Sequence, residues 1–253
     1  MALIVWTGPG DASVGANWVG GVAPGVGDTA RLNNANDMTI DAALNWGGLG
    51  MVGYTGTMSV DNDLDIDGDA TFDGTIDGAA NIEVEAYITA TAGMTMSLTG
   101  DVIWNGSGAV FIQYNAIQIP LEVNGSSILT AQDASFLSSL AVSSGTYNAS
   151  SYAHDMTGNI TISGTGSLNF NTSNIDLNTN TLNGGSIANQ LNTSAQVHDG
   201  TVQNLLIKSD NNKLNCRTNC AKSGTCSRVT WISRPMIDGS LATVGELIQG
   251  KIS

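Results

Sequence analysis

The densest set of residues that could do chemistry is a run of alternating aspartates, namely Asp61, Asp63, Asp65, Asp67 and Asp69. Alternate residues of a strand point to the same side and lie ~6.5–7 Å apart. Two or three neighbouring carboxylates could therefore share one calcium ion, which prefers hard oxygen ligands. The other interpretation is a solvated, self-repelling outer face that prevents sheets from pairing edge to edge.

Part of this run imitates the beginning of an EF-hand loop. Asp63, Asp65 and Asp67 are followed by Gly68, as the first half of such a loop requires. The twelfth position is Gly74 instead of a glutamate, so the bidentate ligand is missing. The spacing thus indicates at most a partial calcium site, and no other cofactor is expected.

Three cysteines, Cys216, Cys220 and Cys226, lie close together near the end of the chain. Zinc would need a fourth ligand, and the two histidines, His154 and His198, precede this segment at spacings that fit no common zinc motif. The alternatives are one disulfide with one thiol, cross-links between subunits, or three free thiols in a reducing compartment.

The remaining carboxylates do not form a recognisable catalytic set. Glu83 and Glu85 share one face of a strand, and glycosidases need two carboxylates ~5–10 Å apart. A lyase acting on an acidic sugar would need cations, and residues 1–207 contain only Arg31. Scattered aromatic residues could stack on a host surface glycan or pack in a core. We expect no catalytic residues and a protein that is not an enzyme.

Charge is divided unevenly along the chain. Residues 1–207 hold one cation against nineteen acidic residues, whereas residues 208–253 hold seven cations against three acidic residues. An acidic body argues against nucleic acid, and no stretch of about 18 apolar residues predicts a membrane span. We expect the basic segment to dock on a partner protein through Lys213, Arg217, Lys222, Arg228 and Arg234.

The elements that must position these residues are short β-strands. Apolar residues alternate with Thr, Asp, Asn or Ser in pieces such as 57–60, 64–66, 82–84 and 159–162, and turn residues separate them. This pattern predicts an all-β protein with one buried and one wet face per strand. Dense Gly and Asn turns favour a right-handed parallel β-solenoid, and a β-sandwich or jelly roll is the alternative. The sequence shows no strict repeat period.

Residues 1–45 form a distinct opening segment in which Trp6 and Trp18 flank Gly-rich turns. These two indoles are predicted to cap the open end of the core. We therefore predict an N-terminal capping or attachment module at 1–45, an acidic solenoid body at 46–207 and a basic, Cys-containing segment at 208–253.

This opening resembles that of β-helical surface proteins, both autotransporter passenger domains and fibre or surface proteins of phage virions. The resemblance rests on Trp6-Thr-Gly8, Asn17-Trp18, Gly21-Val-Ala-Pro24 and Asp28-Thr-Ala30. It implies a right-handed solenoid downstream and no particular activity. The start of the chain lacks the pattern of a secretory signal, which favours assembly in a host cytoplasm and the phage type.

The expected function is that of a non-enzymatic virion structural protein, a capsid decoration protein or short fibre at the virion surface. A homotrimer is expected, because trimerisation would cover strand edges. The alternatives are an adhesin or carbohydrate-binding solenoid of a bacterial cell surface, and a polysaccharide-degrading tailspike.

Overall fold

The computed structural model describes the chain continuously over most of its first two thirds and as separate strands beyond. The described residues are 1–107, 109–113, 119–133, 135–150, 152–169, 174–176, 181–183, 186–187, 196–198, 201–209, 227–233 and 244–247. Side chains are described as far as Leu168, apart from residues 108–118, 134–136 and 151.

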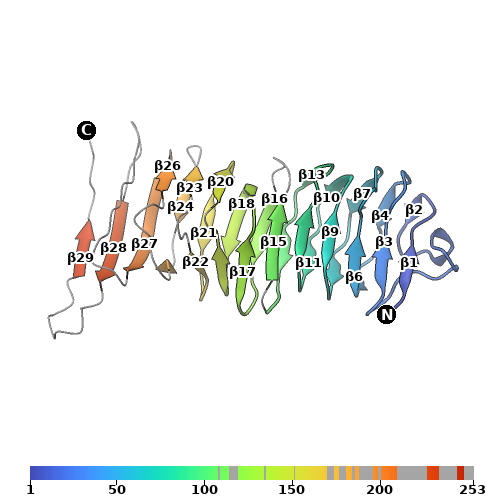
Figure 1. The fold of residues 1–253 in the computed structure, drawn as a ribbon, viewed down its shortest axis with the longest axis horizontal. Coiled ribbons are helices and arrows are strands. Elements are labelled where there is room, and N and C mark those ends of the chain that lie inside the picture. Colours follow the sequence, from blue (N-terminus) through green and yellow to red (C-terminus); the bar gives the residue numbers. More distant parts are fainter. Residues whose placement is uncertain are drawn as a thin grey trace.

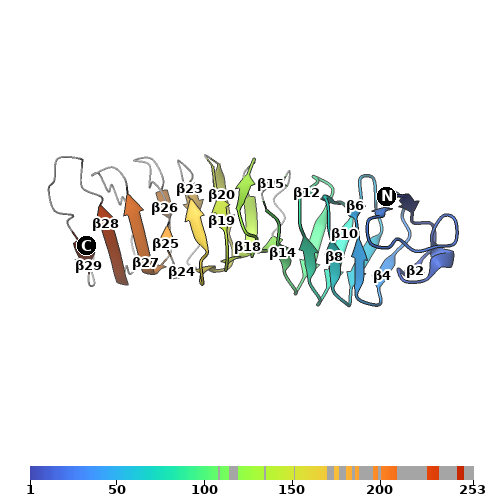
Figure 2. The same ribbon diagram turned by 90° about the horizontal axis from the view of Figure 1, so that it is seen from below.

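Parallel β-strands stack along one axis in the order of the chain, and they build a long β-solenoid (Figures 1 and 2). The predicted fold class is confirmed. The only helix among the described residues is the single-turn 3₁₀ helix η1 (Gly15–Asn17). The described residues thus contain no helix that is long and apolar enough to cross a membrane.

Each turn of the coil contributes one strand to each of several ladders. The first ladder consists of β1 (Leu3–Val5), β3 (Thr29–Arg31), β6 (Gly48–Gly50), β9 (Ala70–Phe72), β12 (Ile88–Ala90), β15 (Ala109–Gln113), β17 (Ile128–Ala131), β19 (Thr146–Asn148), β22 (Ser167–Asn169) and β25 (Ser186–Ile187). The second consists of β5 (Leu44–Trp46), β8 (Leu64–Ile66), β11 (Ile82–Val84), β14 (Val102–Trp104), β16 (Ile119–Val123), β18 (Ser135–Val142), β21 (Ile160–Ile162) and β24 (Thr181–Asn183).

A third ladder forms a separate sheet of β2 (Gly10–Asp11), β4 (Met38–Ile40), β7 (Thr57–Val60), β10 (Thr75–Gly78) and β13 (Thr95–Leu98). Further along, the first half of β18 pairs with β20 (Ala153–Met156), which is followed by β23 (Asn174–Asp176) and β26 (Gln196–His198). The last described strands are β27 (Thr201–Ser209), β28 (Ser227–Ser233) and β29 (Val244–Leu247), and β29 alone is antiparallel to its neighbour.

The register of the second ladder reveals a period that the sequence does not display. The aligned inward-facing positions are the half-buried Leu44 and the buried Leu64, Ile82, Val102, Leu121, Leu140 and Ile160. Successive steps are therefore 20, 18, 20, 19, 19 and 20 residues. The corners absorb the variation in length, so the strands stay aligned while the sequence repeat is irregular.

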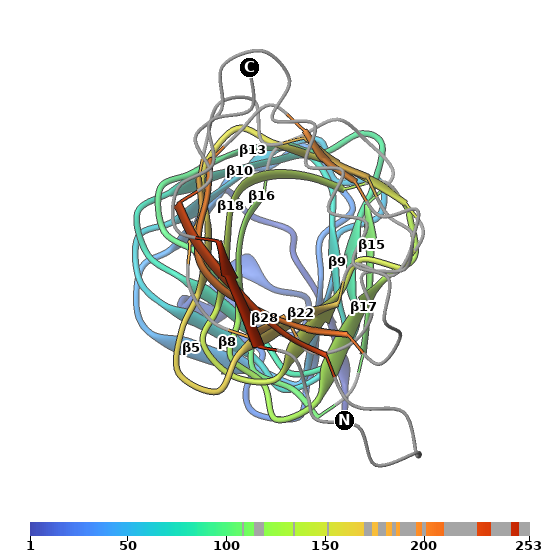
Figure 3. The same cartoon turned by 90° about the vertical axis from the view of Figure 1, so that its left-hand side faces the viewer.

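The coil is right-handed. Figure 3 looks along the axis from the end where β28 lies, so the chain advances toward the viewer. From β8 to β9 to β10 the chain runs anticlockwise, which is the sense of a right-handed turn.

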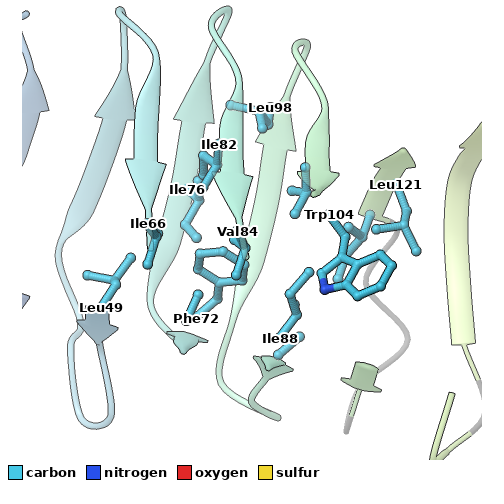
Figure 4. Close-up of a cluster of buried hydrophobic side chains, with 14 of the residues drawn as sticks. Leu49, Ile66, Phe72, Ile76, Ile82, Val84, Ile88, Leu98, Trp104 and Leu121 are labelled. Atoms are coloured by element: carbon cyan, nitrogen blue, oxygen red, sulfur yellow. The ribbon is translucent and has the colours of Figure 1, made fainter. Parts of the chain in front are cut away.

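The interior is filled by side chains at alternate strand positions. In β8, β11 and β14 the first and third residues are buried and the middle residue is half-exposed. Figure 4 shows Ile66, Ile82 and Val84 among the side chains of this core. Each such aliphatic side chain contributes ~1.5–3 kcal/mol when it leaves water, and like residues stack on like residues from turn to turn.

Three indoles, those of Trp6, Trp18 and Trp46, pack together in the N-terminal part of this core. Trp6 meets Trp18 edge to face at 5.0 Å between ring centroids, and Trp18 meets Trp46 in the same way at 5.8 Å. The Trp18 indole N–H donates to the carbonyl of Ala12 at 2.7 Å, and that of Trp6 donates to Asn36 at 3.1 Å. Trp6 and Trp18 are buried, and β1 and β3 belong to the same sheet as the body. The capping role of the two indoles stays a prediction.

Close contact between turns predicts which glycines are indispensable. A Cβ on Gly100 would overlap the carbonyl oxygen of Ala80 in the preceding turn, whereas a Cβ on Gly50 would meet nothing within 4 Å. We expect Gly100→Ala to lower the free energy of unfolding by ~1–3 kcal/mol, and Gly50→Ala to leave it unchanged or slightly raised. Urea denaturation measures both, and equal effects would contradict the stacking described.

Candidate functional site

The aspartate run surrounds β8 and faces outward. Asp65 is the half-exposed middle residue of β8, and Asp61, Asp63, Asp67 and Asp69 are exposed in the corners on either side. The alternation expected from the sequence therefore places all five carboxylates on the solvent side of the coil.

Several of these carboxylates bind the neighbouring turn. The Asn45 side-chain amide donates to Asp65 at 2.8 Å and to Asp67 at 3.1 Å. Asp63 accepts from the backbone N–H of Asn81 at 3.0 Å, and Asp69 accepts in the same way from Tyr87 at 3.2 Å. Their oxygens satisfy donors of adjacent turns instead of converging on one point.

Within the part of the chain that the structure describes, no three or more His, Cys, Asp or Glu residues lie close enough to hold a metal ion. The described aspartates thus offer no convergent ligand group. Calcium binding at Asp61 to Asp69 stays a prediction without geometric support.

The same carboxylate-to-backbone contact recurs at other corners. Asp37 accepts from the N–H of Thr57 at 2.8 Å, and Asp73 accepts from Gly53 and from Gly74, both at 2.9 Å. Each of these bonds except that to Gly74 joins residues about one turn apart. Corner carboxylates therefore act as clamps between successive turns, a role that reasoning from the sequence missed.

Hydrogen bonds at the corners shift the pKa of several carboxyl groups. Backbone N–H donors, first from Ala2 and then from Gly25, lower the pKa of Asp28. Partial burial raises the pKa of Asp41 and Asp73, but the hydrogen bonds that each carboxylate accepts, led by those from Ser13 and from Gly53, respectively, together outweigh burial, and both pKa values end below the usual value. These groups stabilise the fold in the ionised form.

One carboxylate shows the opposite behaviour. Partial burial and then the nearby charge of Glu122 raise the pKa of Asp101. Glu122 lies one turn further along on β16 and accepts from the Ser143 hydroxyl at 2.9 Å. The pair is separated by 21 residues in sequence, so only knowledge of the register could have brought it together.

Glu83 and Glu85 lie on the solvent side of the coil, as the aspartate run does. Glu83 is the half-exposed middle residue of β11, where it aligns with Asp65, and it accepts from the Asn105 amide at 3.3 Å. Glu85 is exposed in the following corner. Aligned residues on adjacent parallel strands lie ~4.8 Å apart, so this face carries closely spaced acidic groups.

Most of the aromatic residues that could stack on sugars belong to the core. Trp46, Trp104, Tyr54 and Tyr147 are buried, whereas Tyr87 and Tyr152 are exposed among the described side chains. No aromatic platform forms on the described surface from these residues.

His154 is a core residue. It is buried, its Nε2 lies 2.9 Å from the carbonyl oxygen of Ala149, and its ring meets Tyr147 edge to face at 6.0 Å. Burial lowers its pKa more than the Ala149 hydrogen bond raises it. His154 is thus held neutral inside the coil, away from any described ligand group.

The predicted docking and cross-linking residues fall on the last fifth of the chain. Lys213, Arg217, Lys222, Arg234 and the three cysteines lie outside the described residues, and Arg228 is described only as backbone of β28. Their assignments remain predictions.

Comparisons of this chain with protein-family models, with curated proteins and with solved structures return no match.

Loss of a corner clamp is expected to weaken the fold in a pH-dependent way. Because the folded-state pKa of Asp73 is lowered, its stabilisation is present above the ordinary value of 3.8 and is lost as the pH falls through the folded-state pKa. Asp73→Asn should lower the free energy of unfolding by ~1 kcal/mol at pH 7, and the difference from wild type should shrink toward pH 3. Asp61→Asn is the control, and an equal loss there would contradict the clamp.

His154 predicts a second, separate pH effect. Its folded-state pKa is lowered from 6.5, so its contribution is complete above pH 6.5 and declines as the pH falls below that value. Melting temperature measured from pH 7.5 to 5 should fall in wild type. His154→Gln, which keeps an amide donor for Ala149, should flatten that slope. A variant with the wild-type slope would refute the assignment.

Proposed function

We propose that this chain is a non-enzymatic structural protein of a virion surface, a capsid decoration protein or short fibre that projects an acidic β-solenoid. The observation that carries the proposal is the use of the corner carboxylates. They clamp one turn to the next on the outside of a continuous aliphatic core, as in a projecting rod, and they do not converge on a ligand.

The surface chemistry supports this role. Residues 1–207 carry nineteen acidic residues against Arg31, which keeps such bodies soluble and apart from one another. A solenoid makes contacts only between neighbouring turns, so it grows into an extended structure without a larger core. Residues 6–30 resemble the opening of β-helical surface proteins, a group that includes proteins of phage virions as well as autotransporter passenger domains.

Attachment is assigned to the basic C-terminal segment and a capsid or tail protein with an acidic surface. Charge complementarity between such surfaces accelerates association and fixes orientation. A homotrimer, and a position at the virion surface after assembly in the host cytoplasm, belong to the same proposal.

Charge reversal tests the attachment. We expect Arg217→Glu, Lys222→Glu and Arg228→Glu together to abolish co-sedimentation of the purified protein with virions that lack it, while the circular dichroism spectrum stays that of wild type. Lys251→Glu, a cation outside the docking set, is the matched control and should still co-sediment. Unchanged attachment of the triple variant would contradict the assignment.

A polysaccharide-degrading tailspike is the second candidate, and the Asp101–Glu122 pair favours it. A carboxyl group whose pKa is raised beside a second carboxylate is the arrangement of a glycosidase acid. If this candidate holds, purified protein should shorten host capsule or lipopolysaccharide glycans, and Asp101→Asn should abolish the cleavage while Asp61→Asn should not. Glycans that stay intact after prolonged incubation would contradict the tailspike candidate and leave the structural role as the proposal.

A further inference from the structure

One corner of the coil carries a polar residue at the same position in five successive turns. This position directly follows each strand of the second ladder from β8 to β18, and its backbone N–H donates to a carbonyl of the turn before at 2.8–3.0 Å. Its occupants are Asp67, Glu85, Asn105, Asn124 and Ser143. The first two turns therefore hold a carboxylate where the next two hold an amide.

Both amides precede a glycine that the packing of the corner requires. A Cβ on Gly106 would overlap the carbonyl oxygen of Glu85, and a Cβ on Gly125 would overlap that of Gly106. No other residue can replace either glycine without a shift of the backbone. Asn105-Gly106 and Asn124-Gly125 are the only Asn-Gly pairs whose side chains the structure describes, and a serine follows each of them.

An asparagine followed by glycine can react within its own backbone. The glycine nitrogen gives its proton to hydroxide and attacks Cγ of the asparagine, and glycine places no side chain in its way. A bond from this nitrogen to Cγ forms, the bond from Cγ to Nδ2 breaks, and ammonia leaves, which closes a five-membered succinimide ring. Water then opens the ring at either carbonyl and gives aspartate or isoaspartate. The net change is hydrolysis of one amide, without an oxidant or a reductant.

The corner at Gly125 leaves the attacking nitrogen without a hydrogen bond. The N–H of Asn124 donates to Trp104 at 2.8 Å, and that of Ser126 donates to Gly106 at 3.0 Å. The N–H of Gly125, between them, has no acceptor among the described residues. Asn124 is exposed, whereas Gly125 is buried in the corner. No hydrogen bond of this N–H therefore has to break before the nitrogen attacks.

The polar neighbours of the two amides differ. Negative charge develops on Oδ1 during the attack, and a hydrogen-bond donor placed there lowers the barrier. The Ser143 hydroxyl lies 3.1 Å from Oδ1 of Asn124 and 2.9 Å from a carboxylate oxygen of Glu122. Because a hydroxyl rotates, it can donate to Oδ1 as the charge develops. Asn105 instead donates its amide to the Glu83 carboxylate at 3.3 Å, which repels that charge.

We propose that Asn124-Gly125 is a self-modification site, at which the folded chain converts an amide into a carboxylate, and that Asn105-Gly106 reacts more slowly. The product continues the row of carboxylates that begins at Asp67 and Glu85, so it occupies a position where the fold already accommodates negative charge. The inference uses only described residues and does not depend on the virion role or on the basic C-terminal segment.

Peptide mapping by mass spectrometry measures both conversions in one sample. The full chain is incubated folded at pH 8 and 37 °C, sampled over weeks, and digested in acid, where the reaction is slow. We expect Asn124 to convert ~10-fold faster than Asn105, a smaller factor than a donor contributes in a buried oxyanion hole. In urea, where both pairs lose their neighbours and share the sequence Asn-Gly-Ser, the two rates should be equal.

Two variants exchange the environments of the pairs. Ser143→Ala removes the donor and should slow conversion of Asn124 in the folded chain. Glu83→Gln removes the repelling charge and should accelerate conversion of Asn105. Neither should change a rate in urea, and unchanged melting temperatures establish that both variants fold. Asn124→Gln is the chemical control, because its longer side chain would have to close a larger ring, and it should stay unmodified.

Three outcomes would overturn the proposal. They are an Asn124 that stays an amide in the folded chain while it converts in urea, an Asn105 that converts as fast as Asn124, and a Ser143→Ala variant that converts Asn124 at the wild-type rate.

Discussion

Each strand of this protein must find its hydrogen-bonding partner one turn away, in parallel and in register, and the rest of the structure depends on that constraint. Parallel pairing between residues 18 to 20 positions apart cannot be fixed by a tight hairpin turn. A slip by one residue would turn every aliphatic side chain outward. The stacked, inward-facing aliphatic side chains and the contacts at the corners together fix the register.

The corners fix the register in two ways, through carboxylates that accept hydrogen bonds from the next turn and through close approach of the backbones of successive turns. A carboxylate that accepts a backbone N–H from the adjacent turn, as Asp37 does from Thr57, satisfies a donor that the strand ladders leave open. Glycines such as Gly100 allow one corner to lie directly against the one before. The same acidic groups cover the outside of the rod, so one residue type supplies both register and mutual repulsion between molecules.

The sequence predicts the strands well because alternation of apolar and polar residues is a local signal. The segments around Leu64, Ile82 and Val102 could be identified as strands with one buried face, and the Gly-rich corners favoured a solenoid over a sandwich. The period could not be read, because aligned residues share only their character and the corners vary in length. The clamps and the Asp101–Glu122 pair were missed for the same reason, since both join residues about 20 positions apart.

The central claim is the stacking of successive turns at a constant rise, and a pair of distances tests it most directly. Asn45, Glu83 and Thr161 face outward on the second ladder, with six turns from the first to the third and four from the second to the third. With ~4.8 Å per turn, spin labels in a variant without the native cysteines should lie ~29 Å and ~19 Å apart in the two pairs, measured by pulsed electron paramagnetic resonance. Two distances that are equal, or that reverse this order, would contradict the solenoid.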